Sequence, residues 1–170
     1  MKYFESKDMI EVWPFVFPFE TINNYYSLKN FLLQVTMLND CFYRIMNLYE
    51  HVAILDFDEI ILPAMNTERT WGQLLEVLPK TIAGDRDVYT FQDLTYPHLG
   101  LKPYSNIPSY LYILSHTQRS VNYTDFSYTS IKLIVSTESV KVVQSHFPIY
   151  CMKENDACNV MHVNPKKGWV

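Results

Sequence analysis

An apolar run that is broken by three acidic residues constrains this chain more than any other feature. Residues 51–63 read HVAILDFDEIILP, and the apolar residues 52–55 are typical of an internal strand in a parallel sheet. Asp56, Asp58 and Glu59 follow directly. A charged group that is buried without a partner is costly. We therefore expect either a bound partner for these acids or a strand that ends at Asp56 and leaves them in a solvated turn.

The spacing of the two aspartates indicates what such a partner can be. Side chains alternate between the faces of a strand, so an extended backbone points Asp56 and Asp58 the same way, roughly 7 Å apart, and turns Phe57 towards the core. Two carboxylates at this separation can reach one hard divalent cation such as Mg²⁺ or Mn²⁺. The carboxyl end of a parallel strand is also where α/β sheets usually bind ligands. An Asp-x-Asp triplet is a weak signal by itself, and the solvated turn stays open as the alternative.

The composition limits the class of protein. A chain of 170 residues is long enough for one domain with its own core. Hydrophobic residues make up 48% and charged residues only 19%, which excludes a disordered chain. The net charge of −4 and the scattered Lys and Arg residues argue against a nucleic-acid-binding surface. No stretch reaches the ~20 apolar residues that span a bilayer, and the first residues lack the apolar centre of a signal peptide.

The remaining periodicities predict one continuous α/β unit. Apolar residues recur at spacings of three and four from residue 27 to residue 50, which predicts a long helix. A short helix is expected over residues 70–78 with Thr70 as its cap, and a second over residues 108–115. Residues 87–94 predict a strand, and residues 130–136 and 139–147 predict a hairpin around a Thr137-Glu138 turn. Residues 9–17 suit an edge strand or an extended arm.

The three cysteines fall into two groups. Cys41 lies on the apolar side of the predicted long helix, and we expect it to be a buried free thiol. Cys151 and Cys158 enclose a short polar loop that can close as a disulfide worth about 2.5 kcal/mol by loop entropy. Such a disulfide indicates an oxidising compartment. The glycosylation triplet at Asn122 points the same way.

Five segments in order resemble the family 92 glycosyltransferases, and the resemblance extends over most of the chain, from about residue 1 to residue 165. They are LNDCFYR at 38–44, HVAILDFDEIILP at 51–63, RTWGQLL at 69–75, HFPIYC at 146–151 and MHVN at 161–164. The resemblance implies a nucleotide-diphospho-sugar transferase fold of the GT-A type. Members are Golgi membrane proteins whose catalytic part faces the lumen, and characterised ones transfer galactose from UDP-galactose to a glycan acceptor with inversion.

The resemblance also implies roles for the three acids. Asp56 and Asp58 would hold a divalent cation, Mn²⁺ by analogy, against the diphosphate of the UDP-sugar donor. A cation there neutralises the charge that develops on UDP as the glycosidic bond breaks. Glu59 would orient the loop or contact the sugar.

The resemblance implies roles for further residues, some of which have another explanation. Arg44 would lie on the donor side, although a surface ion pair with Asp40 explains it equally well. His146 would be an extra metal ligand, with His162 as the second choice. Inversion requires a carboxylate base to deprotonate the acceptor hydroxyl, and Asp125 is the candidate. Two other acids, Asp93 and Glu138, stay open for the same role.

The chain departs from the family pattern at both ends. Family members begin their catalytic domain further upstream, after a membrane anchor and nucleotide-binding strands, and continue beyond the last residue of this chain. We therefore expect residues 1–170 to form a single partial domain that lacks the N-terminal nucleotide-binding part, the C-terminus and the anchor, and that need not retain activity.

Two other functions stay open. The first is a non-catalytic remnant of the same fold that binds carbohydrate or a partner. The second is a haloacid-dehalogenase-type phosphatase, in which an apolar strand also ends in Asp-x-Asp. That family has Gly and then Thr or Val after the second Asp, whereas Glu59 and Ile60 stand here. The phosphatase is accordingly the weaker of the two.

Overall fold

The computed structural model describes residues 5–15, 28–64, 69–78, 86–93, 108, 131–153, 155–164 and 168–169. The chain divides into two compact units, residues 1–37 and residues 38–170. In the first unit, residues 10–15 form neither helix nor strand, so the edge strand that was one reading of this segment is absent from them. The second unit contains every strand that the structure describes.

The predicted long helix is confirmed as α2 (Leu28–Ile45), but it ends five residues early. The Met46 N–H still bonds to the Phe42 carbonyl, and the Leu48 N–H then bonds to the Ile45 carbonyl three residues back. This tighter turn closes the helix before the chain enters the first strand.

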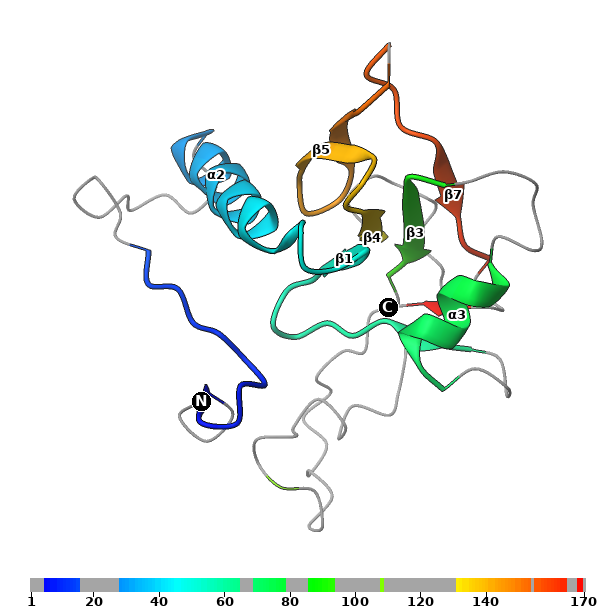
Figure 1. The fold of residues 1–170 in the computed structure, drawn as a ribbon, viewed down its shortest axis with the longest axis horizontal. Coiled ribbons are helices and arrows are strands. Elements are labelled where there is room, and N and C mark those ends of the chain that lie inside the picture. The colour runs from blue at the N-terminus through cyan, green and yellow to red at the C-terminus, as the bar shows by residue number, and fades with distance from the viewer. Residues whose placement is uncertain are drawn as a thin grey trace. The chain divides into compact units, whose positions relative to one another are not determined.

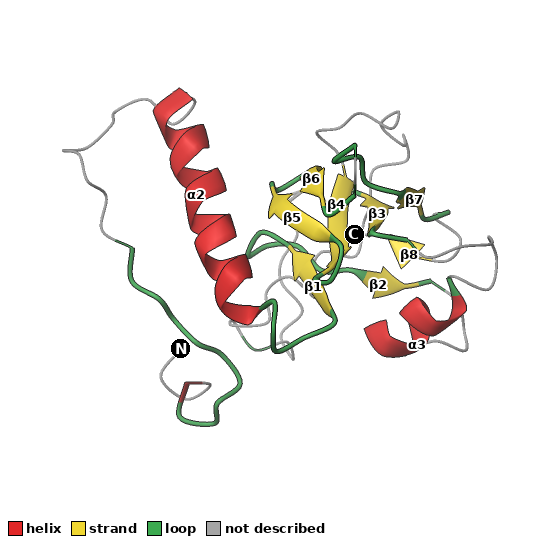
Figure 2. Cartoon of the chain, turned by 45° about the horizontal axis from the view of Figure 1, so that its top comes forward, coloured by secondary structure: helices red, strands yellow, loops and turns green. Residues whose placement is uncertain are grey.

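A four-stranded sheet forms the centre of the second unit. Its strands are β1 (His51–Ile54), β3 (Val88–Gln92), β4 (Ile131–Ser136) and β7 (Val160–His162), in the order β1-β4-β3-β7 (Figure 2). β4 is antiparallel to both β1 and β3, and β7 is parallel to β3. β3 confirms the strand that was predicted over residues 87–94.

The prediction that residues 52–55 form an internal strand of a parallel sheet is wrong. β1 pairs only with β4 among the described strands, and the pair is antiparallel. The apolar run has another cause. Val52 and Ile54 face one core, while Ala53 and Leu55 face a second core on the other side of the sheet.

The two cores define three layers in this unit. On one face, Leu74 and Leu78 at α3 (Trp71–Val77) pack with Tyr89, Phe91 and residues of β4 and β7. The two-stranded pair β2 (Leu62–Pro63) and β8 (Gly168–Trp169) lies on the same side as α3 (Figure 1). The opposite core joins Phe42 of α2 to the central sheet and to the strands β5 (Val140–Val143) and β6 (Pro148–Cys151).

The predicted hairpin between residues 130–136 and 139–147 is wrong in its pairing. Both strands exist, but β5 pairs with β6 and belongs to a separate two-stranded sheet. The Thr137 hydroxyl donates to the carbonyls of Tyr49 and Glu50, which ties the end of β4 to the entrance of β1. The chain then leaves the central sheet. An alternating pattern fits either pairing equally well, since it specifies a face and not a neighbour.

The short helix α3 confirms the prediction for residues 70–78. The Thr70 hydroxyl caps it by accepting a hydrogen bond from the Gln73 N–H. The other short helix, expected over residues 108–115, lies outside the described residues apart from Pro108.

Asn39 joins the end of α2 to β5. Its buried side-chain amide donates to the Val143 carbonyl at 2.8 Å and accepts from the Val143 N–H at 3.0 Å, as a neighbouring strand would. Cys41, close by on the same helix, is a free thiol, but it is exposed, so the prediction that it is buried is wrong. The buried side of this turn of the helix belongs to Asn39 and Phe42.

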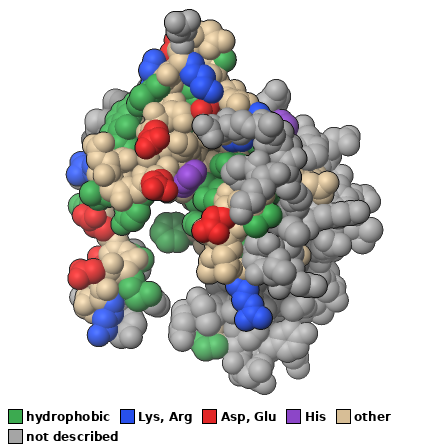
Figure 3. Space-filling view, turned by 45° about the vertical axis from the view of Figure 1, so that its right-hand side comes forward, with side chains coloured by type: hydrophobic (Ala, Val, Ile, Leu, Met, Phe, Trp, Pro, Cys, Tyr) green, Lys and Arg blue, Asp and Glu red, His purple; other side chains and the backbone are tan. Residues whose placement is uncertain are grey.

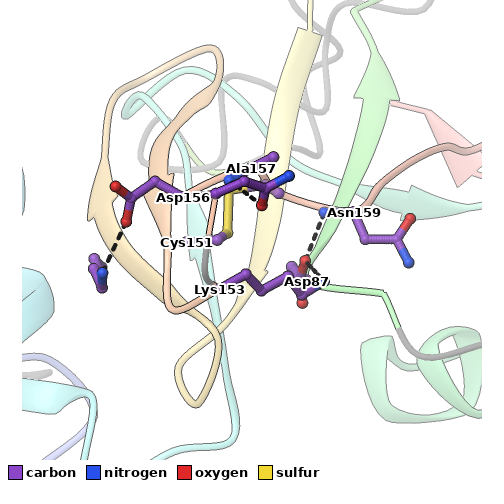
Figure 4. The surroundings of a disulfide bond; sticks show 9 residues. Asp87, Cys151, Lys153, Asp156, Ala157 and Asn159 are labelled. Carbon is purple, nitrogen blue, oxygen red and sulfur yellow. Dashed lines mark hydrogen bonds and ion pairs between the residues drawn. A yellow bond between two sulfur atoms is a disulfide. The ribbon is translucent and has the colours of Figure 1, made fainter.

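The Cys151–Cys158 disulfide is confirmed, with the two Cα atoms 5.1 Å apart. Beside it the buried Asp87 carboxylate accepts from Lys153 Nζ and from the Asn159 N–H (Figure 4). Burial by itself raises the pKa of Asp87, but these hydrogen bonds outweigh it and hold the pKa below its ordinary value. The disulfide and the ion pair together fix the loop between β6 and β7.

Two expectations about surfaces can be compared with the described residues. Lys and Arg side chains on the face shown in Figure 3 are dispersed among acidic and hydrophobic ones, without a continuous basic stripe among the described residues. No helix in the described ranges combines the length and the apolar character that crossing a bilayer requires.

Candidate functional site

The carboxyl ends of β1 and β3 meet at the beginning of β4. Both strands run antiparallel to β4, with Ile54 opposite Leu133 and Gln92 opposite Ile131. The acidic residues that follow β1, and Asp93 after β3, therefore flank the first residues of β4. This edge of the sheet is the candidate site.

Residues 56–59, which we call the acidic turn, do not continue the strand, which ends at Ile54. Asp56 and Asp58 are exposed, as the solvated-turn alternative predicted. The Glu59 N–H donates to the Asp56 carbonyl at 3.2 Å, and the Asp56 N–H donates to Glu59 Oε2 at 2.9 Å. Phe57 is fully exposed, so the prediction that it faces the core is wrong. Alternation of faces applies only to an extended backbone, and the backbone leaves that conformation at Asp56. The same turn overturns the expectation that strand alternation sets Asp56 and Asp58 side by side.

Lys132 pairs with two of the three acids in the turn, Asp56 and Glu59. Its ammonium lies 2.7 Å from Asp56 Oδ2 and 2.8 Å from Glu59 Oε2, and only 3% of its side chain is exposed. Burial lowers the pKa of Lys132, but the hydrogen bonds to the two carboxylates outweigh burial and raise it above the ordinary value. The lysine is therefore a fixed positive charge at neutral pH.

The sequence contained a signal for Lys132 that we did not use. Residues 131–136 read IKLIVS, so one charged residue stands inside an apolar strand. The cost of burying charge, which singled out Asp56, applies equally to this lysine.

Asp93 belongs to the same cluster. It lies two residues beyond Phe91, whose direct partner across the sheet is Lys132, so alternation places Asp93 on the face of Lys132. Burial raises the pKa of Asp93, and the negative charges of Glu59 and Asp58 raise it further, against the opposing effect of Lys132 and His146. A half-buried carboxyl surrounded by other carboxylates is typical of functional sites.

His146 is also brought to this edge. Its Nδ1 lies 3.0 Å from the Ile131 carbonyl oxygen, and because a carbonyl only accepts, Nδ1 carries the proton. In the neutral ring the lone pair is then on Nε2. Metal-binding histidines commonly donate their second ring N–H to a carbonyl in this way.

The acids fit a cation that takes few protein ligands. No group of three His, Cys, Asp or Glu residues among those described is close enough to form a complete metal site. One Asp56 oxygen is bonded to Lys132, whereas Asp58 is exposed and has no hydrogen bond or ion pair to another described residue. Mg²⁺ and similar ions are often held by one or two carboxylates, with phosphate oxygens and water completing the shell. Asp58 and the second Asp56 oxygen have no bond to another described residue, so both are open to such an ion.

The other predicted residues lie elsewhere. Arg44 forms an exposed ion pair with Asp40 at 3.0 Å, which was the alternative to a donor-side role. Glu138 follows the far end of β4 and is therefore not part of the cluster. His162 ends β7, where its Nδ1 lies 2.7 Å from the Thr90 hydroxyl. Asp125 and Asn122 lie outside the described residues.

The described part of residues 38–170 is a mixed α/β unit with acidic residues gathered where β1 and β3 end beside β4. The family comparison specifies it further. All residues, 1–170, match the family model described as Glycosyltransferase family 92, and the chain therefore belongs to this family of glycosyltransferases. No curated protein and no solved structure matches the chain.

Proposed function

We propose that this chain binds a UDP-sugar at the acidic turn and transfers a hexose, galactose by analogy with characterised family members, to a glycan acceptor with inversion. The proposal includes a GT-A type arrangement and a divalent cation, Mn²⁺ in the first instance. The observation that carries it is the turn after β1, in which Asp58 is exposed and only one oxygen of Asp56 is bonded to Lys132.

The chain's own residues divide the work as follows. Asp58 and the second oxygen of Asp56 would hold the cation, which supplies charge neutralisation for the departing diphosphate. Lys132 and Glu59 keep the acidic turn closed. His146 is oriented by the Ile131 carbonyl, and its neutral form would offer the Nε2 lone pair to a cation.

The general base has two candidates in this proposal. Asp125 is retained from the sequence. Asp93 is supported by its position at the cluster and by a pKa that burial raises, since a base works best when its pKa approaches the operating pH.

The disulfide supports a lumenal location. A Cys151–Cys158 bond persists in the oxidising compartments of the secretory pathway. The Golgi lumen, where glycan acceptors are modified, is the proposed site of action.

Calorimetric titration of UDP-galactose tests the proposal. Wild type is expected to bind the donor in Mn²⁺ and to lose most of that affinity in EDTA, whereas Asp58→Asn should bind at least about tenfold more weakly in Mn²⁺. Glu138→Gln is the matched control, because it also neutralises one exposed carboxylate but lies at the far end of β4.

The contradicting outcomes separate the alternatives. Donor binding that is unchanged in Asp58→Asn would remove the acidic turn from the site. Glycan binding that is independent of Mn²⁺ would favour the non-catalytic remnant. Turnover of a phosphomonoester in Mg²⁺ that is lost in Asp56→Asn would favour the phosphatase.

A further inference from the structure

Lys132 reaches the acidic turn from the neighbouring strand β4. One ammonium bridges two carboxylates that stand three residues apart, at 2.7 Å and 2.8 Å. A divalent cation bound to the acidic turn would be expected to bridge the same two groups, since both are hard oxygen ligands.

The bridge changes the charge that the turn offers to a cation. Asp56, Asp58, Glu59 and Asp93 together carry four negative charges when ionised, and Lys132 offsets one of them from within the cluster. It also occupies Glu59 Oε2 and Asp56 Oδ2, and Glu59 Oε2 additionally accepts from the Asp56 N–H. Asp58 is then the one carboxylate of the acidic turn without a hydrogen-bonded partner among the described residues.

We infer that Lys132 takes the bridging position between Asp56 and Glu59 in place of a divalent cation, and thereby makes cation binding depend on the donor's diphosphate. The inference rests on the proposed function. Asp58, the second oxygen of Asp56 and Glu59 Oε1 are the carboxylate oxygens of the turn without a bond to another described residue, so a cation there needs phosphate oxygens to complete its shell. Lys132 acts here as a positioning residue, through the carboxylates that it holds.

The inference predicts that loss of Lys132 raises the affinity for Mn²⁺. Loss of a purely structural residue predicts no such rise. Lys132→Met removes the charge and keeps most of the aliphatic stem. Its affinity for Mn²⁺ without nucleotide should rise about tenfold, because a positive charge next to the site is removed and two oxygens are released. The factor by which UDP tightens Mn²⁺ binding should fall by a similar amount.

Two further variants also test whether Lys132 controls the affinity for Mn²⁺ without nucleotide. Glu59→Gln leaves Lys132 with Asp56 alone, so Mn²⁺ binding without nucleotide should become weaker than in wild type. Lys132→Arg keeps the charge and should restore low Mn²⁺ affinity without nucleotide. Lys141→Met is the control, because Lys141 pairs with Asp156 at the surface and its removal should leave Mn²⁺ binding unchanged.

The measurement is electron paramagnetic resonance of free Mn²⁺ in titrations of the full chain, with and without UDP, with thermal unfolding to verify each variant. Tighter binding in Lys132→Met and weaker binding in Glu59→Gln support the inference. Equal or weaker Mn²⁺ binding in a folded Lys132→Met, while wild type still binds Mn²⁺ with UDP, overturns the inference alone. Absence of any Mn²⁺–UDP binding by wild type overturns the proposed function, and the inference with it.

Discussion

The ammonium of Lys132 lies 2.7 Å from the Asp56 carboxylate, although 76 residues separate the two in sequence. The ion pair joins the inner strand β4 to the turn after β1, and the lysine end of it is buried. The two residues come together only when the chain folds. The ion pair therefore stabilises both the sheet and the conformation of the acidic turn.

The pH dependence of stability should reveal this pair. The pKa of Lys132 is raised in the folded chain above the ordinary value of 10.5. The contribution of Lys132 to the free energy of unfolding is therefore fully present below about pH 10.5. It is lost as the pH rises through the folded-state pKa. The free energy of unfolding of wild type, measured by urea denaturation relative to Lys132→Met, should decline over that alkaline range. A difference that stays constant with pH would show that the ion pair contributes nothing.

Asp93→Asn is expected to stabilise the protein at neutral pH. The folded-state pKa of Asp93 is raised above the ordinary value of 3.8, first by burial and then by Glu59, so its ionised form is disfavoured in the folded chain. The penalty is absent below the ordinary pKa and appears as the pH rises through the folded-state pKa. Thermal unfolding should give a higher melting temperature than wild type at pH 7 and an equal one near about pH 3. A lower melting temperature at pH 7 would instead mark Asp93 as a structural residue.

Asn39→Ala should cost about 2 to 4 kcal/mol of unfolding free energy, because it leaves the N–H and the carbonyl of Val143 without their partner in a buried place. Asn47→Ala, an exposed position just beyond α2, should change stability by less than about 0.5 kcal/mol. Denaturant titrations of both variants make the comparison. Equal effects of the two changes would contradict the role of Asn39 as the link between α2 and β5.

Reduction of the disulfide should lower stability by about 2.5 kcal/mol, the loop-entropy contribution of a bond between Cys151 and Cys158. Thermal unfolding of wild type with and without a reductant measures the effect. The double variant Cys151→Ala, Cys158→Ala should show no response to the reductant. A response in that variant would assign the effect to some group other than this bond.

The secondary structure could largely be predicted from the sequence, because it depends on local periodicity. α3 with its Thr70 cap and β3 were predicted within a few residues. The pairing of the strands could not be predicted in this way. The apolar run before Asp56 indicates a strand that is covered on both faces. An antiparallel edge strand between two cores has this property, and so does an internal parallel strand.

The site was predictable in part. The cost of buried charge drew attention to the acids, but Asp56 and Asp58 are exposed and the buried charge is that of Lys132. The family resemblance proposed His146 as a ligand, and its Nδ1 lies 3.0 Å from the carbonyl oxygen of Ile131, the first residue of β4. The alternation argument failed for Phe57, because the hydrogen bonds between Asp56 and Glu59 that close the turn are not encoded in the apolar pattern. Lys132 was missed since its partners lie in the turn after another strand, 76 and 73 residues away in sequence, and such contacts are a tertiary property.

The formation of UDP from UDP-galactose in the presence of a glycan acceptor tests the central claim most directly. Wild type in Mn²⁺ should release UDP, EDTA should abolish the release, and Asp58→Asn should reduce it by about 100-fold or more, as expected for loss of a group that holds the cation against the leaving diphosphate. Release by Asp58→Asn at the wild-type rate, or release by wild type that persists in EDTA, would contradict a metal-dependent transferase site at the acidic turn.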